Sequence, residues 1–245
     1  MESKAIILGA TSGIGKEIAI QLAEKGWKVG IAGRRRELLD DLVASHDNII
    51  ASRTIDVTRE DAPALLLDLI NEMEGIDLYL HSSGIGWQNI ELDIEKELQT
   101  ISTNAMGVTR MVDTMFHYFE SHPDHVGHIA VISSIAGTKG LGASPSYSAT
   151  KRYVNHYLEC LTQLCSIRKI RHIRLHDIRP GFVRTPLISG VTYPMQLDVK
   201  PVAREIIRGI EHGKSIITVD WRYRILVFFW RLIPRCIWVR LRFLH

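Results

Sequence analysis

Short apolar runs alternate with longer amphipathic stretches through the first 220 residues, and this alternation limits the possible folds more than any other feature of the chain. A buried strand, a helix and a second buried strand form the repeating unit of α/β proteins with parallel sheets. The expected strands are Lys4–Gly9, Lys28–Ala32, Ile49–Ile55, Asp77–His81, His128–Ser133, His172–Ile178 and Ser215–Val219. The expected helices are Ile14–Lys25, Glu37–Ser45, Asp61–Met73, Glu95–Glu120 (one or two helices), Ser146–Arg168 and Pro201–His212. We therefore expect a doubly wound, mainly parallel, seven-stranded sheet with helices on both faces.

No linker, repeat or low-complexity segment divides residues 1–220, so we expect one domain followed by a C-terminal tail, residues 221–245. With 46% hydrophobic and 23% charged residues, the chain has the composition of a folded globular protein and not of a disordered one. Three cysteines are too few for a disulfide scaffold, and no secretory signal is visible at the first residues. We therefore expect a reducing, cytoplasmic location.

The net charge of +3 hides an uneven distribution. The tail holds six arginines and no carboxylate; taking those six from the 30 basic residues leaves 24 against 27 acidic ones, about −3, in residues 1–220. Because the excess positive charge lies in one short segment, a nucleic acid is not an expected partner.

A glycine-rich turn, Gly9-Ala10-Thr11-Ser12-Gly13-Ile14-Gly15, connects the first expected strand to the first expected helix. Glycines allow the backbone to turn sharply, and they let a pyrophosphate approach the main-chain N–H groups at the positive end of a helix. The turn therefore predicts a dinucleotide site, although similar turns also occur for packing alone.

The second expected strand ends in Gly33-Arg34-Arg35-Arg36, with no carboxylate before Glu37. In dinucleotide-binding folds an acid at this point binds the ribose 2′-OH, whereas an arginine accommodates a 2′-phosphate. This pattern favours NADP(H) over NAD(H), with Arg34 as the predicted contact; the alternative is that the arginines are simply solvated. Asp56, at the end of the third expected strand, has two equal interpretations, as an acceptor for an adenine amino group or as a cap for the following turn.

Tyr147 and Lys151 lie four residues apart on an expected helix, so their side chains project from the same face. A nearby ammonium favours the phenolate, so we expect Lys151 to lower the pKa of Tyr147 and to make it a general acid or base. A serine at the end of the adjacent strand, within Val131-Ile132-Ser133-Ser134, can hold a substrate oxygen. Taken alone, such a tyrosine–lysine pair is usually an ordinary surface pair.

Together these segments resemble the short-chain dehydrogenase/reductase family, in its single-domain Rossmann-like branch, over about residues 3–220. The matching segments are Gly9 with Thr11–Gly15, Asp56-Val57, His81–Gly84, Asn104, Ser133–Gly137, Tyr147–Lys151 and Arg179–Thr185. One departure is His81-Ser82-Ser83-Gly84, where the family usually has Asn-Asn-Ala-Gly. We interpret His81 as a brace between strands and not as a catalytic residue.

The resemblance implies a role for each matching residue. Tyr147 is the expected general acid/base, and Ser134, not Ser133, occupies the position that polarises the substrate oxygen. Lys151 is expected to bind the nicotinamide ribose, and Asn104 to hold a water of a proton relay. The remaining residues expected to contact the cofactor are Gly9, Thr11, Ser12, Gly13, Ile14, Gly15, Arg34, Asp56, Val57, Gly84, Pro180, Gly181, Val183 and Thr185, with the last two near the carboxamide.

The tail is rich in arginine and aromatic residues. On a continuous helix Arg224, Arg231, Arg235 and Arg242 would lie within roughly 40° of one another, with Pro234 causing a kink. The longest apolar run, six residues, is too short to span a membrane. An arginine stripe opposite tryptophan and phenylalanine is typical of a helix at a bilayer surface, so we expect a peripheral contact, on the inner face of a membrane. The alternative is that the tail packs on the domain or in an oligomer.

These features predict an NADP(H)-dependent oxidoreductase that interconverts a ketone and a secondary alcohol. The mostly apolar segment between Pro186 and Lys200 favours a lipophilic substrate, such as a fatty-acyl, sphingoid or steroid-like molecule. The alternative is a non-catalytic nucleotide-binding sensor or scaffold at a membrane. By resemblance we expect a homo-oligomer, formed through helices Glu95–Glu120 and Ser146–Arg168. No metal site is expected, because the histidines between residues 117 and 128 lack a ligand spacing.

Overall fold

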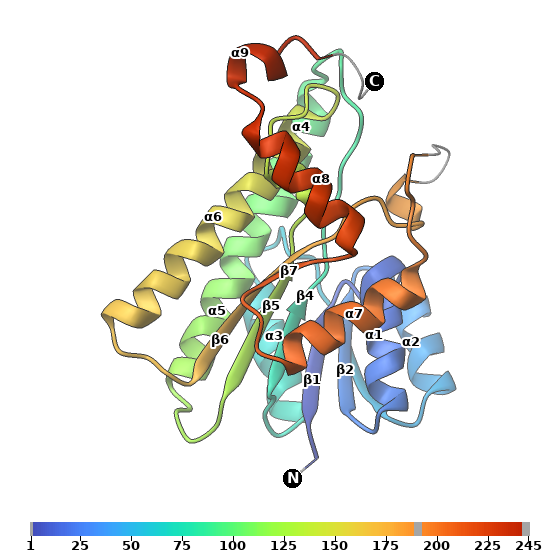
Figure 1. Ribbon diagram of the computed structural model, residues 1–245. Coiled ribbons are helices and arrows are strands. Elements are labelled where there is room, and N and C mark those ends of the chain that lie inside the picture. The colour runs from blue at the N-terminus through green and yellow to red at the C-terminus, as the bar shows by residue number, and fades with distance from the viewer. Residues whose placement is uncertain (1, 189–192, 242–245) are drawn as a thin grey trace.

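The computed structural model describes residues 2–188 and 193–241 and contains one seven-stranded sheet in the order β3-β2-β1-β4-β5-β6-β7 (Figure 1). The strands are β1 (Lys4–Leu8), β2 (Lys28–Gly33), β3 (Ile49–Thr54), β4 (Leu78–His81), β5 (Gly127–Ile132), β6 (Ile173–Arg179) and β7 (Ile216–Thr218). Every pairing is parallel, as crossover connections between neighbouring strands require. The predicted doubly wound α/β fold is confirmed, and the sheet is parallel throughout.

Helices cover both faces of the sheet and enclose two separate hydrophobic cores. Helices α1 (Gly13–Glu24), α2 (Arg36–Ser45) and α7 (Val199–Glu211) pack on one face. Helices α3 (Ala62–Glu72), α5 (Val108–Glu120) and α6 (Pro145–Ile167) pack on the other. Because both faces of the strands are covered, most of their residues are apolar, and the strands were therefore recognisable in the sequence. β6 departs from this pattern, with Arg174, His176, Asp177 and Arg179 among its seven residues.

The order of the strands reverses between β1 and β4, because the chain builds β2 and β3 on one side of β1 and then crosses to the other. In open α/β sheets a ligand crevice forms outside the carboxyl ends of the strands at such a reversal. The predicted cofactor and catalytic residues follow the carboxyl ends of β1, β2, β3, β4, β5 and β6. The topology therefore collects them at one edge, the upper edge in Figure 1.

The long stretch expected as helix Glu95–Glu120 has three parts. Helix α4 (Ile94–Ile101) is followed by a π-helical segment, Ser102–Gly107, and then by α5. Such wide turns are rare and occur often at functional sites. Asn104 lies in the middle of this segment and is buried. Two short 3₁₀ helices, Ile135–Gly137 and Pro186–Ile188, follow β5 and β6.

The tail forms two helices, α8 (Trp221–Leu232) and α9 (Arg235–Trp238), above the carboxyl edge of the sheet (Figure 1). Ile233 and Pro234 have extended backbone between them, because a proline disfavours helical geometry at the preceding residue. The arginine stripe expected for one continuous helix is therefore interrupted, and Arg242 lies outside the described residues. Within the described part of the chain, no helix is long and apolar enough to cross a membrane.

Candidate active site

The turn between β1 and α1 requires glycine at three points. Gly9 has a positive φ of +91°, and a Cβ there would lie 2.6 Å from the Ser83 backbone nitrogen. A Cβ on Gly15 would lie 2.5 Å from the Gly9 carbonyl oxygen. Gly13, with φ of +57°, lies against the Thr185 side chain, where an added Cβ would be 3.2 Å from its methyl carbon. The turn thus contacts the ends of both β4 and β6, and two segments predicted to bind the cofactor meet here.

The first turn of α1 leaves its amide groups without a side-chain partner among the described residues. Ser12 is the N-cap residue, its side chain makes no cap hydrogen bond, and the first turn of the helix has no acidic residue. The amide groups and the positive end of the helix dipole are therefore suited to a phosphate. Thr11, Ser12 and Ile14 are all partly exposed at this point.

Of the three arginines after β2, Arg35 is the one that contacts the glycine-rich turn. Its Nη2 atom lies 2.6 Å from the Thr11 hydroxyl and 2.8 Å from the Ser12 hydroxyl. Arg34, the residue favoured by the sequence, is exposed and lies close enough to Asp56 to lower the pKa of that carboxyl group. Both guanidinium groups flank the same edge of the sheet, so Arg35 is a candidate contact that sequence reasoning did not select.

The Asp56 carboxylate caps the turn after β3. It accepts hydrogen bonds from the Thr58 amide at 3.0 Å and from the Thr58 hydroxyl at 2.7 Å. Partial burial raises the pKa of Asp56, but these bonds and the charges of Arg34 and Arg59 outweigh burial and leave the pKa below its usual value. Val57 is buried, and a Cβ on Gly107 would lie 2.7 Å from its side chain, so it packs directly on the π-helical segment.

Tyr147, Ser134 and Lys151 meet at the carboxyl end of β5. The Ser134 side chain lies near the Tyr147 hydroxyl, close enough to lower the pKa of that phenol. It accepts from the Ala136 amide at 3.0 Å, which fixes its orientation. The Lys151 ammonium donates to the Ile132 carbonyl at 2.9 Å and lies 5.6 Å from the centre of the Tyr147 ring. The predicted trio is thus in place, with the phenol directed toward the serine.

The pKa values in this trio depend mainly on burial. Burial raises the pKa of Tyr147, and the nearby Ser134 side chain offsets only part of this effect. Desolvation of the phenolate dominates, so the pKa of Tyr147 is raised overall, whereas the sequence led us to expect a pKa lowered by Lys151. Burial lowers the pKa of Lys151 to about 8, even though the Asp177 carboxylate raises it. At neutral pH the phenol is protonated and the lysine is still mostly charged.

Asn104 connects the π-helical segment to the loop after β4. Its amide nitrogen donates to the Ile85 carbonyl at 2.6 Å, and its oxygen accepts from the Ile85 amide at 2.9 Å. A Cβ on Gly84 would lie 3.4 Å from both the Asn104 oxygen and the Lys151 ammonium, so this loop passes close to the trio. At Gly86 a Cβ would lie 2.3 Å from the Tyr147 ring. Gly86 makes room for that ring. In the sequence, the spacing Gly84-Ile85-Gly86 could have indicated a close approach of the backbone to another group.

A buried polar cluster lies beside the trio and was not anticipated. Asp177, in β6, accepts hydrogen bonds from Ser133, from Asn155 at 3.1 Å and from the Arg179 guanidinium at 2.7 Å. Asp177 is 4% exposed, and its charge acts on Lys151. The signal in the sequence was the one carboxylate of β6, between His176 and Ile178.

The hydrogen bond of His81 lies within its own strand, β4, and its Nε2 atom is buried without a partner among the described residues, so the expected brace between strands is not observed. The Nδ1 atom of His81 lies 2.8 Å from the Tyr79 hydroxyl, and both side chains are fully buried. Burial, together with the charge of Lys151, lowers the pKa of His81 to about 3. The ring is therefore neutral at physiological pH and unsuited to proton transfer there.

The segment after β6 is held by the tail. Pro180 is buried, and its carbonyl accepts from the Ile135 amide at 3.1 Å. A Cβ on Gly181 would lie 2.2 Å from the ring of Tyr223 in α8. The Tyr223 hydroxyl accepts from the Phe182 amide at 3.1 Å and donates to the Met195 carbonyl at 3.0 Å. Val183 is buried beside these groups, so α8 supports the segment from which cofactor contacts are expected.

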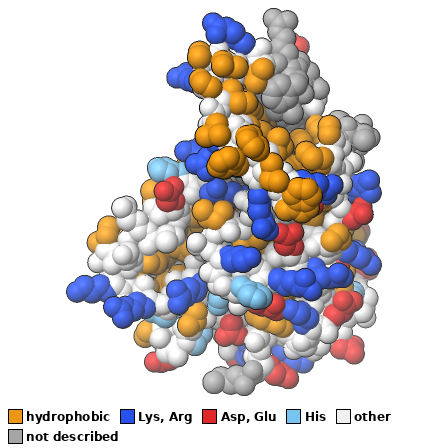
Figure 2. Space-filling model, in the orientation of Figure 1, with side chains coloured by type: hydrophobic (Ala, Val, Ile, Leu, Met, Phe, Trp, Pro, Cys, Tyr) orange, Lys and Arg blue, Asp and Glu red, His pale blue; other side chains and the backbone are white. Residues whose placement is uncertain are grey.

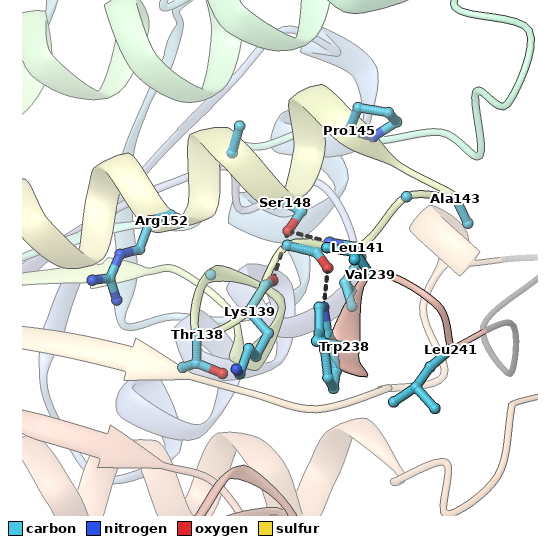
Figure 3. Close-up of a pocket in the computed structure, with 14 residues that line it drawn as sticks. Thr138, Lys139, Leu141, Ala143, Pro145, Ser148, Arg152, Trp238, Val239 and Leu241 are labelled. Carbon is cyan, nitrogen blue, oxygen red and sulfur yellow. Dashed lines mark hydrogen bonds between the residues drawn. The ribbon is translucent and has the colours of Figure 1, made fainter. Parts of the chain in front are cut away.

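The tail also holds the loop that joins Ser134 to Tyr147. The Trp230 indole donates to the Thr138 hydroxyl at 2.8 Å, and the Trp238 indole donates to the Gly140 carbonyl at 2.7 Å. Figure 3 shows Trp238 on one side of this loop and Ser148 of α6 on the other, each forming hydrogen bonds with it. Beside them is a cavity of about 800 Å³, lined by residues 137–143, by α6 and by Trp238, Val239 and Leu241, but not by Tyr147 or Ser134. It is therefore distinct from the site around Tyr147 and Ser134.

Comparisons with known proteins agree with this architecture. The family model for "short chain dehydrogenase" matches residues 3–194. An uncharacterized oxidoreductase of Myxococcus xanthus is 27% identical over 241 residues, covering 94% of this chain and 92% of its own length. An uncharacterized oxidoreductase of Listeria innocua is 35% identical over 195 residues, covering 76% and 77%. A short-chain dehydrogenase from Burkholderia cenocepacia, solved in complex with NADP, has a TM-score of 0.81 at 19% identity, covering 98% and 97%.

The chain belongs to the short-chain dehydrogenase/reductase family, because the family model covers well over half of it. The structural similarity supports the Rossmann-like fold, and the identity of the reaction rests on the site itself.

Proposed function

We propose that this protein is an NADP(H)-dependent oxidoreductase that interconverts a ketone and a secondary alcohol. The observation that carries the proposal is the placement of Ser134 near the Tyr147 hydroxyl, with the Lys151 ammonium 5.6 Å from the Tyr147 ring centre, at the same edge of the sheet as the glycine-rich turn. Proton transfer to or from an oxygen requires a donor within hydrogen-bond reach of it. A carbonyl oxygen placed between the two hydroxyl groups meets this condition.

In the reduction direction, the Tyr147 hydroxyl donates its proton to the developing alkoxide while Ser134 holds that oxygen by a second hydrogen bond. The nicotinamide, when bound, supplies or accepts the hydride. The raised pKa of Tyr147 suits this direction, because the phenol stays protonated and ready to donate at neutral pH. Lys151 stabilises the phenolate that forms, and Asn104 keeps the loop after β4 in position beside both groups.

The 2′-phosphate of the cofactor explains the charge at the end of β2. Arg34 and Arg35 follow Gly33 there, and no acid stands where it would bind a free ribose 2′-OH. A phosphate dianion would be repelled by such an acid and is bound well by guanidinium groups. This supports NADP(H) as the preferred cofactor, with Thr11, Ser12 and the start of α1 facing the pyrophosphate.

A lipophilic substrate fits the segment between β6 and α7. Leu187 and Met195 are both exposed there, and the ring of Tyr193 stacks on that of Phe182 with centroids 4.1 Å apart. Apolar side chains beside a polar reacting group are typical of sites for hydrophobic small molecules. This composition supports an apolar ketone, such as a fatty-acyl, sphingoid or steroid-like compound.

The proposal is tested by following NADPH and NADH oxidation with a panel of lipophilic and hydrophilic ketones. We expect turnover with NADPH and an apolar ketone, and a loss of about a thousandfold in kcat for Tyr147→Phe with NADPH binding retained. Tyr153→Phe is the matched control, because Tyr153 is on the same helix and its hydroxyl bonds only to Thr109 among the described contacts. Full activity of Tyr147→Phe would remove the proposed acid. Cofactor binding without turnover of any ketone would favour the sensor alternative.

A further inference from the structure

Helix α8 has two apolar faces, and only one of them is covered. Tyr223, Val227 and Trp230 are buried against the domain. At 3.6 residues per turn, the outward residues lie within roughly 100° of one another on the opposite side of the helix. These outward residues are Trp221, Ile225, Phe228, Phe229 and Leu232, and each is about half or more exposed, from 48% to 65%. A soluble helix normally turns only one such face toward protein and leaves the other polar.

Helix α9 extends the apolar surface. Ile237 and Val239 are 51% and 66% exposed. Figure 2 shows hydrophobic side chains gathered over the upper part of the molecule, where α8 and α9 lie, with lysine or arginine side chains at its borders. We call these outward residues of α8 and α9 the tail surface. Contiguous exposed apolar surface of this kind marks an interaction site.

Arginines flank the tail surface on both sides of α8. Arg222 is on one flank, and Arg224 and Arg231 are on the other, roughly 80–100° from the centre of the apolar face. Arg222 and Arg224 pair with Asp220 and Glu205. Among the described residues no carboxylate lies within ion-pair distance of Arg231 or Arg235. The free positive charges therefore lie at the end of α8 and the start of α9.

We infer that the tail surface binds an anionic lipid bilayer, lying in the interface with its arginines at the headgroups. Aromatic and aliphatic side chains on one face with arginines on its flanks are suited to this position, and each arginine near an anionic surface strengthens binding. A symmetric contact between two copies would place these arginines against each other, with no carboxylate in residues 221–245 to neutralise them. Charge therefore favours lipid over a second copy of the chain.

The inward face of the same helices contacts the candidate active site. Tyr223 binds the segment from Phe182 to Met195, and Trp230 and Trp238 bind the loop between Ser134 and Tyr147. When the outward face lies on the bilayer, the segment after β6 and the loop between Ser134 and Tyr147 are separated from the lipid by about the diameter of one helix. Binding to a bilayer goes beyond the proposed reaction. It would place the protein at a membrane surface and let an apolar substrate enter from the lipid phase.

The experiment is co-sedimentation of the full chain with vesicles of phosphatidylcholine alone and with about a third phosphatidylglycerol. We expect binding to the anionic vesicles, weakened by salt. The Phe228→Ser/Leu232→Ser variant should lose it. Arg231→Ser/Arg235→Ser should weaken it about 25-fold, about fivefold for each arginine. Ile167→Ser and Arg208→Ser change an exposed aliphatic residue and an exposed arginine outside the tail, and both should bind normally.

Circular dichroism and NADPH binding confirm that each variant is folded, and neither depends on finding a substrate. Absence of binding to anionic vesicles, or unchanged binding of Phe228→Ser/Leu232→Ser, would overturn the inference. A dimer that this variant dissociates, without vesicle binding by the parent chain, would instead assign the tail surface to self-association. Because no turnover is measured, a failure here leaves the proposed reaction unaffected.

Discussion

The interior around Lys151 and the contact between the tail and the domain are stabilised by different kinds of interaction. Around Lys151 the buried groups are polar or charged, and most of them are paired: Asp177 with Ser133 and Asn155, and Asn104 with the Ile85 backbone. Among the described residues, the Asn155 side-chain oxygen is left without a partner. The tail is attached mainly by large aromatic rings, whose few polar atoms donate to single partners. The structure around Lys151 therefore depends on the protonation state of its buried groups. The attachment of the tail depends instead on how well its aromatic rings fit the domain.

The largest expected effect is acid destabilisation, which tests the first half of this comparison. Burial lowers the pKa of His81 to about 3 and that of His176 to about 4, from 6.5 in the unfolded chain. Both rings are therefore neutral in the fold, and the stability they contribute is complete above pH 6.5 and is lost as pH falls toward these values. Urea denaturation should show a loss on the order of 4 kcal/mol between pH 7 and pH 5.

Two variants test the acid destabilisation, one at a buried histidine and one at an exposed histidine. His176→Asn should make the free energy of unfolding less dependent on pH between 6.5 and 4. His212→Asn, at an exposed helix end, should leave the dependence unchanged. Stability that stays constant from pH 7 to pH 5 would contradict the account of the buried histidines.

The next effect comes from Asp177→Asn. The substitution removes the charge that faces Arg179, whose side chain is only 16% exposed, and it leaves Lys151 without its supporting carboxylate. We expect about 2 kcal/mol less stability, somewhat below the loss for a fully buried pair. The lysine pKa should fall further, which moves the pH–rate profile to lower pH. Glu72→Gln, which breaks an exposed pair with Arg53, should cost less than about 0.5 kcal/mol. Equal effects of the two variants would refute the proposed importance of this cluster.

Gly181→Ala tests the second half of the comparison, because it acts on packing without changing a charge. The new Cβ would lie 2.2 Å from the Tyr223 ring, so α8 must shift, at a cost of about 2 kcal/mol in unfolding free energy. Gly142→Ala is the matched control, because no atom of the described residues lies within 4 Å of a Cβ there. If urea denaturation gives the same midpoint for both variants, the contact between α8 and the segment after β6 is loose.

The smallest effect is expected for Tyr223→Phe, which keeps the ring and removes the hydroxyl. The hydroxyl joins the Phe182 amide to the Met195 carbonyl, so its loss should cost about 1 kcal/mol. If the hydroxyl positions this segment over the crevice, KM for the ketone should rise while kcat stays nearly constant. A change in kcat with an unchanged KM would contradict a role of the Tyr223 hydroxyl in positioning this segment for substrate binding.

The fold could be predicted from the sequence because the strands are covered on both faces and the helices are amphipathic. The glycine-rich turn and the Tyr147–Lys151 spacing likewise indicated the site, since each depends on local geometry that residue type alone imposes. The choice between Arg34 and Arg35 could not be made in this way. Arg35 has extended backbone as the N-cap of α2, and that conformation directs its side chain to Thr11.

Features that depend on distant parts of the chain were also beyond prediction. The pKa of Tyr147 depends on how deeply several loops bury it, and the role of Asp177 depends on β6 pairing with β5 beside Asn155. The break between α8 and α9 had a local signal in Pro234, but the turn of both helices back onto the loop after β5 did not.

The loop between Ser134 and Tyr147 contains Gly137, Gly140 and Gly142, and Trp230 and Trp238 restrain it from outside. Such an arrangement separates the proposed reacting hydroxyls from the residues that hold the loop between them. The proposed reacting hydroxyls can stay fixed while exchanges in the last 25 residues remodel the entrance around them. Diversification of substrate choice within this lineage is therefore expected to leave its record in the C-terminus.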